Sequence, residues 1–236
     1  GVVGDLPAEE NAIVACMSAP PAPFVPEEHH FAPGTAVLLA GFGSPEEHAQ
    51  TLARLQAGPA PLFEFSTPMP YVALQQLLDE ANAWGQYYYD KGSYLEELSD
   101  GVVDELVARL PQRTSPGSIA LLYRLDGAYS AVPEDATAFS GGRSPRYGTF
   151  FVAACPTPEE LAADRAWVRG LHSALEPYAT DESVYVNALS DGVDDARVRS
   201  AYGKEKYDRL AEIKQRYDPQ NLFHRNANIR PARAAR

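Results

Sequence analysis

The side chains best suited to bind or orient a small molecule are tyrosines that alternate along short apolar stretches. Tyr87 and Tyr89 would project from one face of an extended strand, and Tyr88 from the other. Tyr185 and Asn187 have the same spacing and would project together. A tyrosine on a half-buried strand offers a ring for stacking and a hydroxyl that can orient a ligand. The pattern predicts a ligand-binding wall, with core packing as the alternative for each residue.

Other polar residues give weaker indications of chemistry. Arg143, just before a predicted strand, can act either as a clamp on a substrate or as a solvated loop residue. The five histidines lie in loops, on polar helix faces or in the tail, and are expected to be solvated. No Ser or Cys has the context of a hydrolase nucleophile. The Cys and His spacing predicts no metal site, and Cys16 and Cys155 are expected to be buried free thiols.

Length and charge limit the class of protein. The chain has 236 residues, 45% of them hydrophobic, and a formal net charge of −12. That length suits one large globular domain or two small ones. The acidic balance argues against binding to nucleic acid or anionic lipid, because both need a basic surface. No apolar run approaches the roughly 18–20 residues of a membrane helix. A cytoplasmic and a secreted location both stay open, with the cytoplasm slightly favoured.

Short apolar runs alternate with helical patterns along the chain. Two helices are expected to begin at Ser44 and Thr157, each a capping residue followed by Pro and two acids. Apolar stripes at helical spacing, including that of residues 71–81, are expected to face the core. The glycine-rich phosphate loops of doubly wound nucleotide-binding folds are missing. The predicted strands are Asn11–Ser18, Thr35–Gly43, Pro61–Ser66, Gly85–Asp90, Ser118–Leu125, Gly148–Ala154 and Ser183–Leu189. We therefore predict an α+β fold: an antiparallel sheet of about six or seven strands covered by helices on one face, with a C-terminal helix and a hooked tail.

The C-terminal segment differs from the body of the chain. Residues 209–236 hold seven basic and two acidic side chains in an otherwise acidic protein. An amphipathic helix over residues 204–217 is expected to end before Pro219. Asn221 and Asn226 can then bind free backbone groups in the turn that follows. A basic tail on an acidic body indicates that the tail has a different neighbour.

The tail also carries a specific pattern. Tyr217-Asp218-Pro219-Gln220-Asn221-Leu222-Phe223, followed by Asn226-Ala227-Asn228-Ile229 and Pro231, resembles the C-terminal signature of the berberine-bridge-enzyme-like FAD-linked oxidases. Five further stretches resemble bacterial members of that family in the same order: residues 19–28, 69–71, 91–95, 132–139 and 185–187. The resemblance extends over nearly the whole chain from about residue 8.

The resemblance implies FAD as the cofactor and a small molecule as the substrate. In this family the flavin is held mainly by an N-terminal domain of the vanillyl-alcohol-oxidase type, and an antiparallel sheet covered by helices forms the substrate side. Tyr185 and Asn187 match residues that the family places beside the isoalloxazine ring. Asn228 matches an asparagine near the cofactor. These three residues are therefore the expected cofactor-binding residues of this chain.

One position departs from the family pattern. Ala188 stands where many members have a tyrosine that acts as the general base. Tyr185, Tyr87 and Tyr89 are therefore the candidate catalytic residues, and amine oxidation, which needs less help from a base, is an alternative. The candidate substrate-binding residues are Arg143, Tyr87 and Tyr89.

The resemblance also predicts how the chain is divided. Residues 1–200 are expected to be a substrate-binding domain that is incomplete at its N-terminus, and residues 201–236 to return to a flavin domain absent from this sequence. The chain is then the C-terminal part of a longer FAD-linked oxidoreductase acting on a small alcohol, sugar or amine. Alone it is expected to be inactive as an oxidase and to pair with itself or aggregate. The alternative is a freestanding flavin-free domain, either a small-molecule binding protein or a cofactor-independent isomerase or cyclase.

Overall fold

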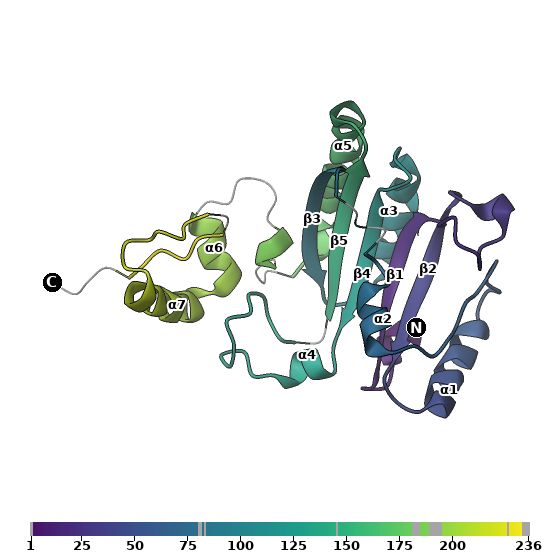
Figure 1. Cartoon of the computed structure of the whole chain (residues 1–236), viewed down its shortest axis with the longest axis horizontal. Coiled ribbons are helices and arrows are strands. Elements are labelled where there is room, and N and C mark those ends of the chain that lie inside the picture. Colours follow the sequence, from purple (N-terminus) through teal and green to yellow (C-terminus); the bar gives the residue numbers. More distant parts are fainter. Residues whose placement is uncertain are drawn as a thin grey trace.

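The computed structural model describes residues 2–79, 82, 84–144, 146–180, 185–188, 195–225 and 227–232. Five strands form one antiparallel sheet in the order β2-β1-β4-β5-β3 (Figure 1). They are β1 (Glu10–Ser18), β2 (Pro33–Gly41), β3 (Tyr87–Leu95), β4 (Ile119–Leu125) and β5 (Arg146–Cys155). The predicted α+β class is confirmed, with five strands in the described chain instead of six or seven.

Two of the predicted strands are wrong. Residues 61–66 form neither helix nor strand, and Leu62 and Phe65 point into solvent. In the run Ser183–Leu189, the described residues contain the 3-10 turn η6 (Val186–Ala188), while residues 183, 184 and 189 lie outside the described part. Both runs are short and apolar, but those properties alone do not distinguish a paired strand from an exposed segment or a turn.

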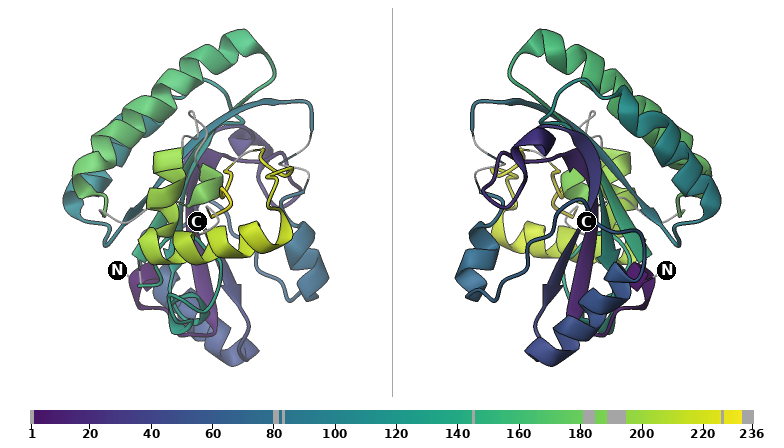
Figure 2. Two further views of the ribbon diagram at one scale, coloured as in Figure 1. Left: turned by 90° about the vertical axis from the view of Figure 1, so that its left-hand side faces the viewer. Right: turned by 90° about the vertical axis from the view of Figure 1, so that its right-hand side faces the viewer.

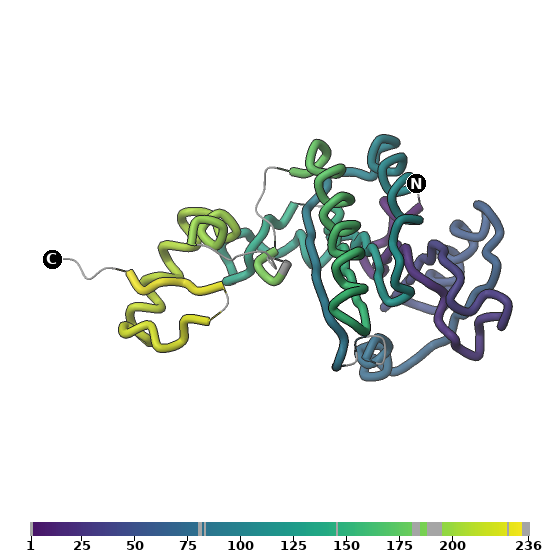
Figure 3. The backbone as a smooth tube through the Cα atoms, turned by 90° about the horizontal axis from the view of Figure 1, so that it is seen from above, coloured from purple at the N-terminus to yellow at the C-terminus, as the bar shows by residue number. Residues whose placement is uncertain are grey.

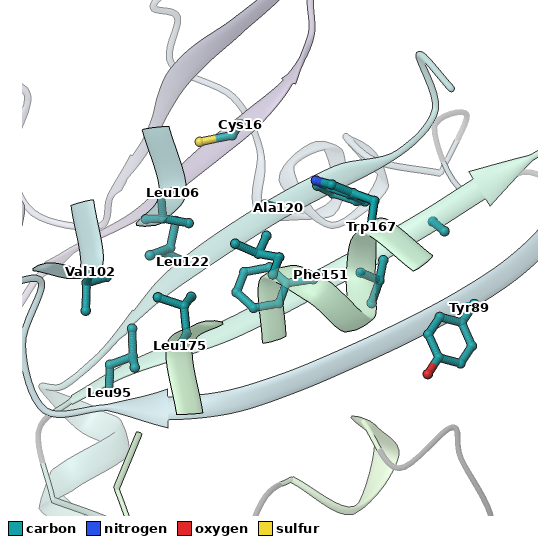
Figure 4. Close-up of a cluster of buried hydrophobic side chains, with 13 residues drawn as sticks. Cys16, Tyr89, Leu95, Val102, Leu106, Ala120, Leu122, Phe151, Trp167 and Leu175 are labelled. Carbon is teal, nitrogen blue, oxygen red and sulfur yellow. The ribbon is translucent and has the colours of Figure 1, made fainter. Parts of the chain in front are cut away.

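Two helices cover one face of the sheet. α3 (Asp100–Arg109) and α5 (Pro158–Leu175) lie side by side on it (Figures 1 and 2). α5 begins as predicted, with the Thr157 side chain accepting a hydrogen bond from the Glu160 amide at 3.2 Å. Strand side chains alternate between faces, so Phe151 of β5 points toward these helices and is fully buried. Figure 4 shows the resulting core, in which Leu95, Val102, Leu122, Phe151 and Leu175 are among the labelled side chains.

The opposite face of the sheet is only partly covered. The short helix α2 (Tyr71–Gln76) lies on this side (Figures 1 and 2). The apolar stripe of residues 71–81 was expected to face the core, and this expectation is wrong for its described part. Tyr71, Leu77 and Leu78 are 63%, 53% and 46% exposed, so these side chains of the stripe lie largely in solvent.

The remaining elements join or flank these layers. α1 (Pro45–Gln56) begins with the predicted Ser44 cap, which forms a complete capping box with Glu47. Along the chain, α4 (Ala128–Ala131) follows β4 and precedes β5. Besides η6, the described chain contains the 3-10 turns η1 (Val2–Asp5), η2 (Glu27–His29), η4 (Leu110–Gln112) and η5 (Glu176–Tyr178). Cys16 and Cys155 are buried and free, as predicted. No helix in the described ranges is long and apolar enough to cross a membrane.

The C-terminal elements build a small core of their own at one side of the sheet (Figures 1 and 3). α6 (Asp195–Tyr202) packs against α7 (Lys204–Tyr217), and Val198 and Tyr207 are buried between them and the tail. α7 ends before Pro219, as predicted. The predicted boundary at residue 200 falls inside α6 and stays a prediction. Of the two turn asparagines, Asn221 adopts a left-handed φ of 53°, and Asn226 lies outside the described residues.

Candidate functional site

Tyr185 and Asn187 lie together just outside the sheet. The Asn187 amide donates a hydrogen bond to the Tyr185 hydroxyl at 2.7 Å. Tyr185 is 39% exposed, and the Asn187 side chain is exposed as well. The backbone N–H of Val186 donates to the Ser140 hydroxyl at 3.1 Å. The two residues expected to project together are thus brought together by a 3-10 turn and not by a strand.

An aromatic and cationic stack lies behind Tyr185. The Phe139 ring stacks on the Tyr185 ring, with 5.6 Å between centroids and 24° between planes. The Arg143 guanidinium carbon lies 4.5 Å from the centre of Phe139 and 5.2 Å from that of Tyr129. Arg143 also donates hydrogen bonds to the Tyr129 carbonyl at 3.3 Å and to the Thr137 hydroxyl at 3.0 Å. Tyr185 therefore rests on a layer of packed side chains from the segment that joins β4 and β5.

Two phenols lie next to this stack, the buried Tyr94 and the half-buried Tyr129. Tyr129 donates a hydrogen bond to the Gly142 carbonyl, and the Tyr94 hydroxyl in turn hydrogen-bonds to Tyr129. Burial, and then the neighbouring Tyr129, raise the pKa of Tyr94 well above its ordinary value. Burial also raises the pKa of Tyr129. Both phenols therefore stay protonated near neutral pH.

A glycine allows the loop to approach these phenols. Gly141 has a φ of +88°, and a Cβ there would lie 2.6 Å from the Tyr94 hydroxyl oxygen. A larger residue would therefore be strained in its backbone and would also displace Tyr94. The backbone N–H of Gly141 donates to the carbonyl of Ala201 at 3.1 Å, which ties this loop to α6.

The same loop holds the C-terminal unit against the sheet. Lys206 of α7 pairs with Glu134 at 2.9 Å and donates to the Phe139 carbonyl at 2.8 Å. Arg209 donates to the Asp135 carbonyl at 3.1 Å. Between the loop and the α6–α7 junction lies an open cavity of about 580 Å³. Its lining includes Glu134, Gly141, Arg143, Ser144, Tyr202 and Gly203. The Tyr185–Asn187 pair thus lies where three parts of the molecule meet.

Comparisons with known proteins show what this chain is similar to. Residues 184–230 match the family model described as berberine and berberine like. An FAD-linked oxidoreductase of Dictyostelium discoideum is 27% identical over 199 residues, which are 84% of this chain and 43% of that protein. The chain is therefore similar to the berberine bridge enzyme-like proteins.

Solved structures share the fold. A berberine bridge enzyme variant superimposes with a TM-score of 0.76 at 17% identity. The 6-hydroxy-D-nicotine oxidase of Arthrobacter nicotinovorans gives a TM-score of 0.72 at 18% identity. Each match covers 98% of this chain and 50% of the other. The chain thus spans about half the length of these solved proteins.

The structure does not bring Tyr87 and Tyr89 to Tyr185. Both lie on the helix-covered face of β3, toward the end of the strand away from η6. Tyr89 is 6% exposed, accepts a hydrogen bond from Arg169 at 3.0 Å, and packs under Arg165 at 4.6 Å. Tyr87 is half exposed at the strand end. They form part of the sheet–helix layer and not of the cluster around Tyr185.

Asn228 lies in the tail segment that crosses α7. The N–H of Arg230 donates to the Tyr207 hydroxyl at 3.2 Å, and Ala232 bonds to the Ala211 carbonyl at 3.0 Å. The side-chain carbonyl oxygen of Asn228 is buried and has no hydrogen-bond partner in the described chain. Burial of an acceptor without a donor costs free energy, so the Asn228 oxygen is suited to a hydrogen-bond donor from outside this chain.

Sequence reasoning missed Tyr94, Tyr129 and Phe139. Tyr94 and Phe139 stand within the stretches that resemble the family, but nothing in a single sequence shows that they meet. The available signal was the Gly141-Gly142 pair before Arg143, which marks a place where the backbone comes close to another group. Finding the partner required the sheet register. No group of three metal-ligating side chains is found in the part of the chain that the structure describes.

Proposed function

We propose that this chain forms the substrate side of an FAD-dependent oxidoreductase that oxidises a small alcohol, sugar or amine. The observation that carries the proposal is the Tyr185–Asn187 pair, which is exposed, mutually hydrogen-bonded at 2.7 Å and supported from behind by a packed stack. The named relatives include FAD-linked oxidoreductases and oxidases. Polar groups held on a rigid support are what orienting a substrate requires.

The residues present fit FAD as the cofactor. Asn228 offers a buried acceptor without a partner, and Asn187 and Tyr185 offer exposed polar groups. When bound, FAD supplies the hydride acceptor for the oxidation. The chain supplies orientation, because the Asn187 amide donates a hydrogen bond to the Tyr185 hydroxyl and fixes the position of that oxygen.

The neighbouring phenols restrict which residue can move a proton. Burial raises the pKa of Tyr94, Tyr129 and Tyr202, so all three are poor bases near neutral pH. Tyr185 is the exposed phenol of the cluster and the proposed proton acceptor for an alcohol or sugar. An amine can lose hydride without such a base, so the two substrate classes differ in how much they need Tyr185.

We propose that a flavin-binding domain is the partner of the open side of this chain. Tyr71 and Val72 on α2 are 63% and 66% exposed, and Leu222 and Phe223 in the tail are 68% and 82% exposed. Exposed apolar groups of this kind are typical of a surface that another protein unit covers. The solved relatives are about twice as long as this chain, which provides room for such a domain.

The test uses the natural protein that contains this chain, purified with its flavin. The bound flavin is mixed anaerobically with alcohols, sugars and amines, and its loss of visible absorbance reports reduction. For an alcohol or sugar, Tyr185→Phe should slow reduction on the order of 100-fold, the size of a lost proton-transfer residue. For an amine the rate should change little.

Two controls make the test specific. Tyr178→Phe removes a 40% exposed phenol of η5, the turn after α5, and should leave the rate unchanged. A purified natural protein that contains no flavin, or that isomerises or cyclises a substrate without flavin, would contradict the proposal and favour the freestanding domain.

A further inference from the structure

The 185–187 segment needs support because it is not part of the sheet. The described support comes from two neighbouring residues of one loop. The Phe139 ring stacks on Tyr185, and the Ser140 hydroxyl accepts the Val186 N–H. Lys206 of α7 donates to the carbonyl of Phe139, so the loop itself is held at that position.

Arg143 is committed to this support. Its guanidinium lies over two rings, Phe139 at 4.5 Å and Tyr129 at 5.2 Å. Each terminal nitrogen already donates one hydrogen bond within the loop, to the Tyr129 carbonyl or the Thr137 hydroxyl. The Nε atom is buried from solvent. A planar guanidinium can lie against aromatic rings and at the same time donate hydrogen bonds in its own plane. A lysine ammonium cannot make the ring contacts and these hydrogen bonds together.

We propose that Phe139 and Arg143 are positioning residues that fix the Tyr185–Asn187 pair. The inference rests on the proposed function for its consequence and on the stacking geometry for its mechanism. Arg143 orders Phe139, Phe139 orders the Tyr185 ring, and the ring sets the direction of the hydroxyl that Asn187 holds. Arg143 thus acts through Phe139 and does not itself contact the substrate.

The mechanism is tested on this chain without any flavin. Tyrosine labelled with carbon-13 in the ring gives one signal set per tyrosine, and Tyr185→Phe assigns that of Tyr185. Phe139→Leu should remove the ring-current shift of the Tyr185 signals, and Arg143→Lys should shift them by less in the same direction. Phe139→Tyr keeps a ring and should restore the native shift.

A matched control separates positioning from general damage. Phe24→Leu removes one ring of the stacked pair Phe24–Phe65, whose centroids are 4.9 Å apart. It should leave the Tyr185 signals unchanged. Unmoved Tyr185 signals in Phe139→Leu would overturn the proposal, whether or not the protein binds flavin.

The consequence is tested on the flavin-loaded natural protein. A misplacement of about 1 Å can cost on the order of 100-fold in rate, so Phe139→Leu should lower kcat between about 10-fold and 100-fold with KM little changed. Phe139→Tyr should restore kcat. A Phe139→Leu protein with native kcat would overturn the positioning role. Absence of flavin would instead defeat the proposed function, and the tyrosine signals would still decide the stacking mechanism.

Discussion

Two neighbouring residues of β5 show how differently the two faces of the sheet are used. Phe151 points toward α3 and α5 and has no exposed surface, whereas Phe150 points to the other face and is only partly buried. Helices α3 and α5 of this chain cover the first face. The open face and the tail leave apolar side chains in solvent, and the Tyr185–Asn187 pair is exposed as well. Stability should therefore depend on the first face and function on the second.

Truncation of each ring in turn tests whether the two faces differ in how closely they are packed. Phe151→Ala should lower the free energy of unfolding by about 3–5 kcal/mol, because it removes a fully buried ring and leaves a cavity. Phe150→Ala should cost clearly less, because that ring is already partly in water. Chemical denaturation of the two variants measures the difference. Equal losses would show that the open face is as closely packed as the covered one.

The buried Asp164 provides a test of how much polar interactions on the covered side contribute to stability. This carboxylate is fully buried at the start of α5 and accepts hydrogen bonds from Thr114, Ser115 and Ser118. Asp164→Ala should lower the free energy of unfolding by about 3 kcal/mol, because the donor groups of three residues lose their hydrogen-bond acceptor. Equilibrium unfolding near neutral pH measures the loss.

The same carboxylate predicts a pH dependence. Burial opposes ionisation, but the hydrogen bonds from Ser118, Thr114 and Ser115 outweigh it and lower the pKa of Asp164. The folded state therefore holds its stabilisation above the ordinary Asp value of about 3.9 and loses it as the pH falls through the lower folded value. The stability difference between wild type and Asp164→Ala should shrink only in that acid range. A difference that shrinks already between pH 7 and 5 (about three to one units above that value) would contradict this assignment.

Self-association tests the open side. Tyr71→Ser combined with Val72→Ser removes two exposed side chains of α2, next to the Phe42 ring 6.3 Å from Tyr71. The double variant should pair with itself less than the wild type in sedimentation velocity, because less apolar surface remains to be covered. Val107→Ser removes a 67% exposed side chain of α3 on the covered side and should change nothing. A wild-type chain that stays monomeric at all concentrations would show that the open side needs no cover.

The sequence predicted the covered side better than the open one. The Thr157 and Ser44 caps and the α+β layers follow from local rules and were confirmed. The strand at Ser183–Leu189 was wrong because a short apolar run does not report whether a partner strand exists. The stripe at 71–81 looked like a core face for the same reason: periodicity detects an apolar side, and only tertiary structure shows what covers it. Tyr185 and Asn187 were singled out by spacing, but their support by Phe139 depends on a contact 46 residues away in sequence, between 185 and 139, that no local pattern contains.

The smallest expected effect compares two helix caps. Thr157 caps α5, which buries five side chains against the sheet, and Ser44 caps α1, in which only Thr51 is buried. Both changes to Ala remove a hydrogen bond worth about 1 kcal/mol to the first turn. Thr157→Ala should therefore lower the free energy of unfolding by about that amount. Ser44→Ala should leave global stability nearly unchanged and speed amide hydrogen exchange in the first turn of α1, because a helix with little buried surface can fray without unfolding the sheet. Hydrogen exchange measures the fraying of the first turn in the two variants, and denaturation measures their free energies of unfolding. An equal loss of global stability in both variants would place α1 within the cooperative core and remove the distinction between the covered and the open parts of the molecule.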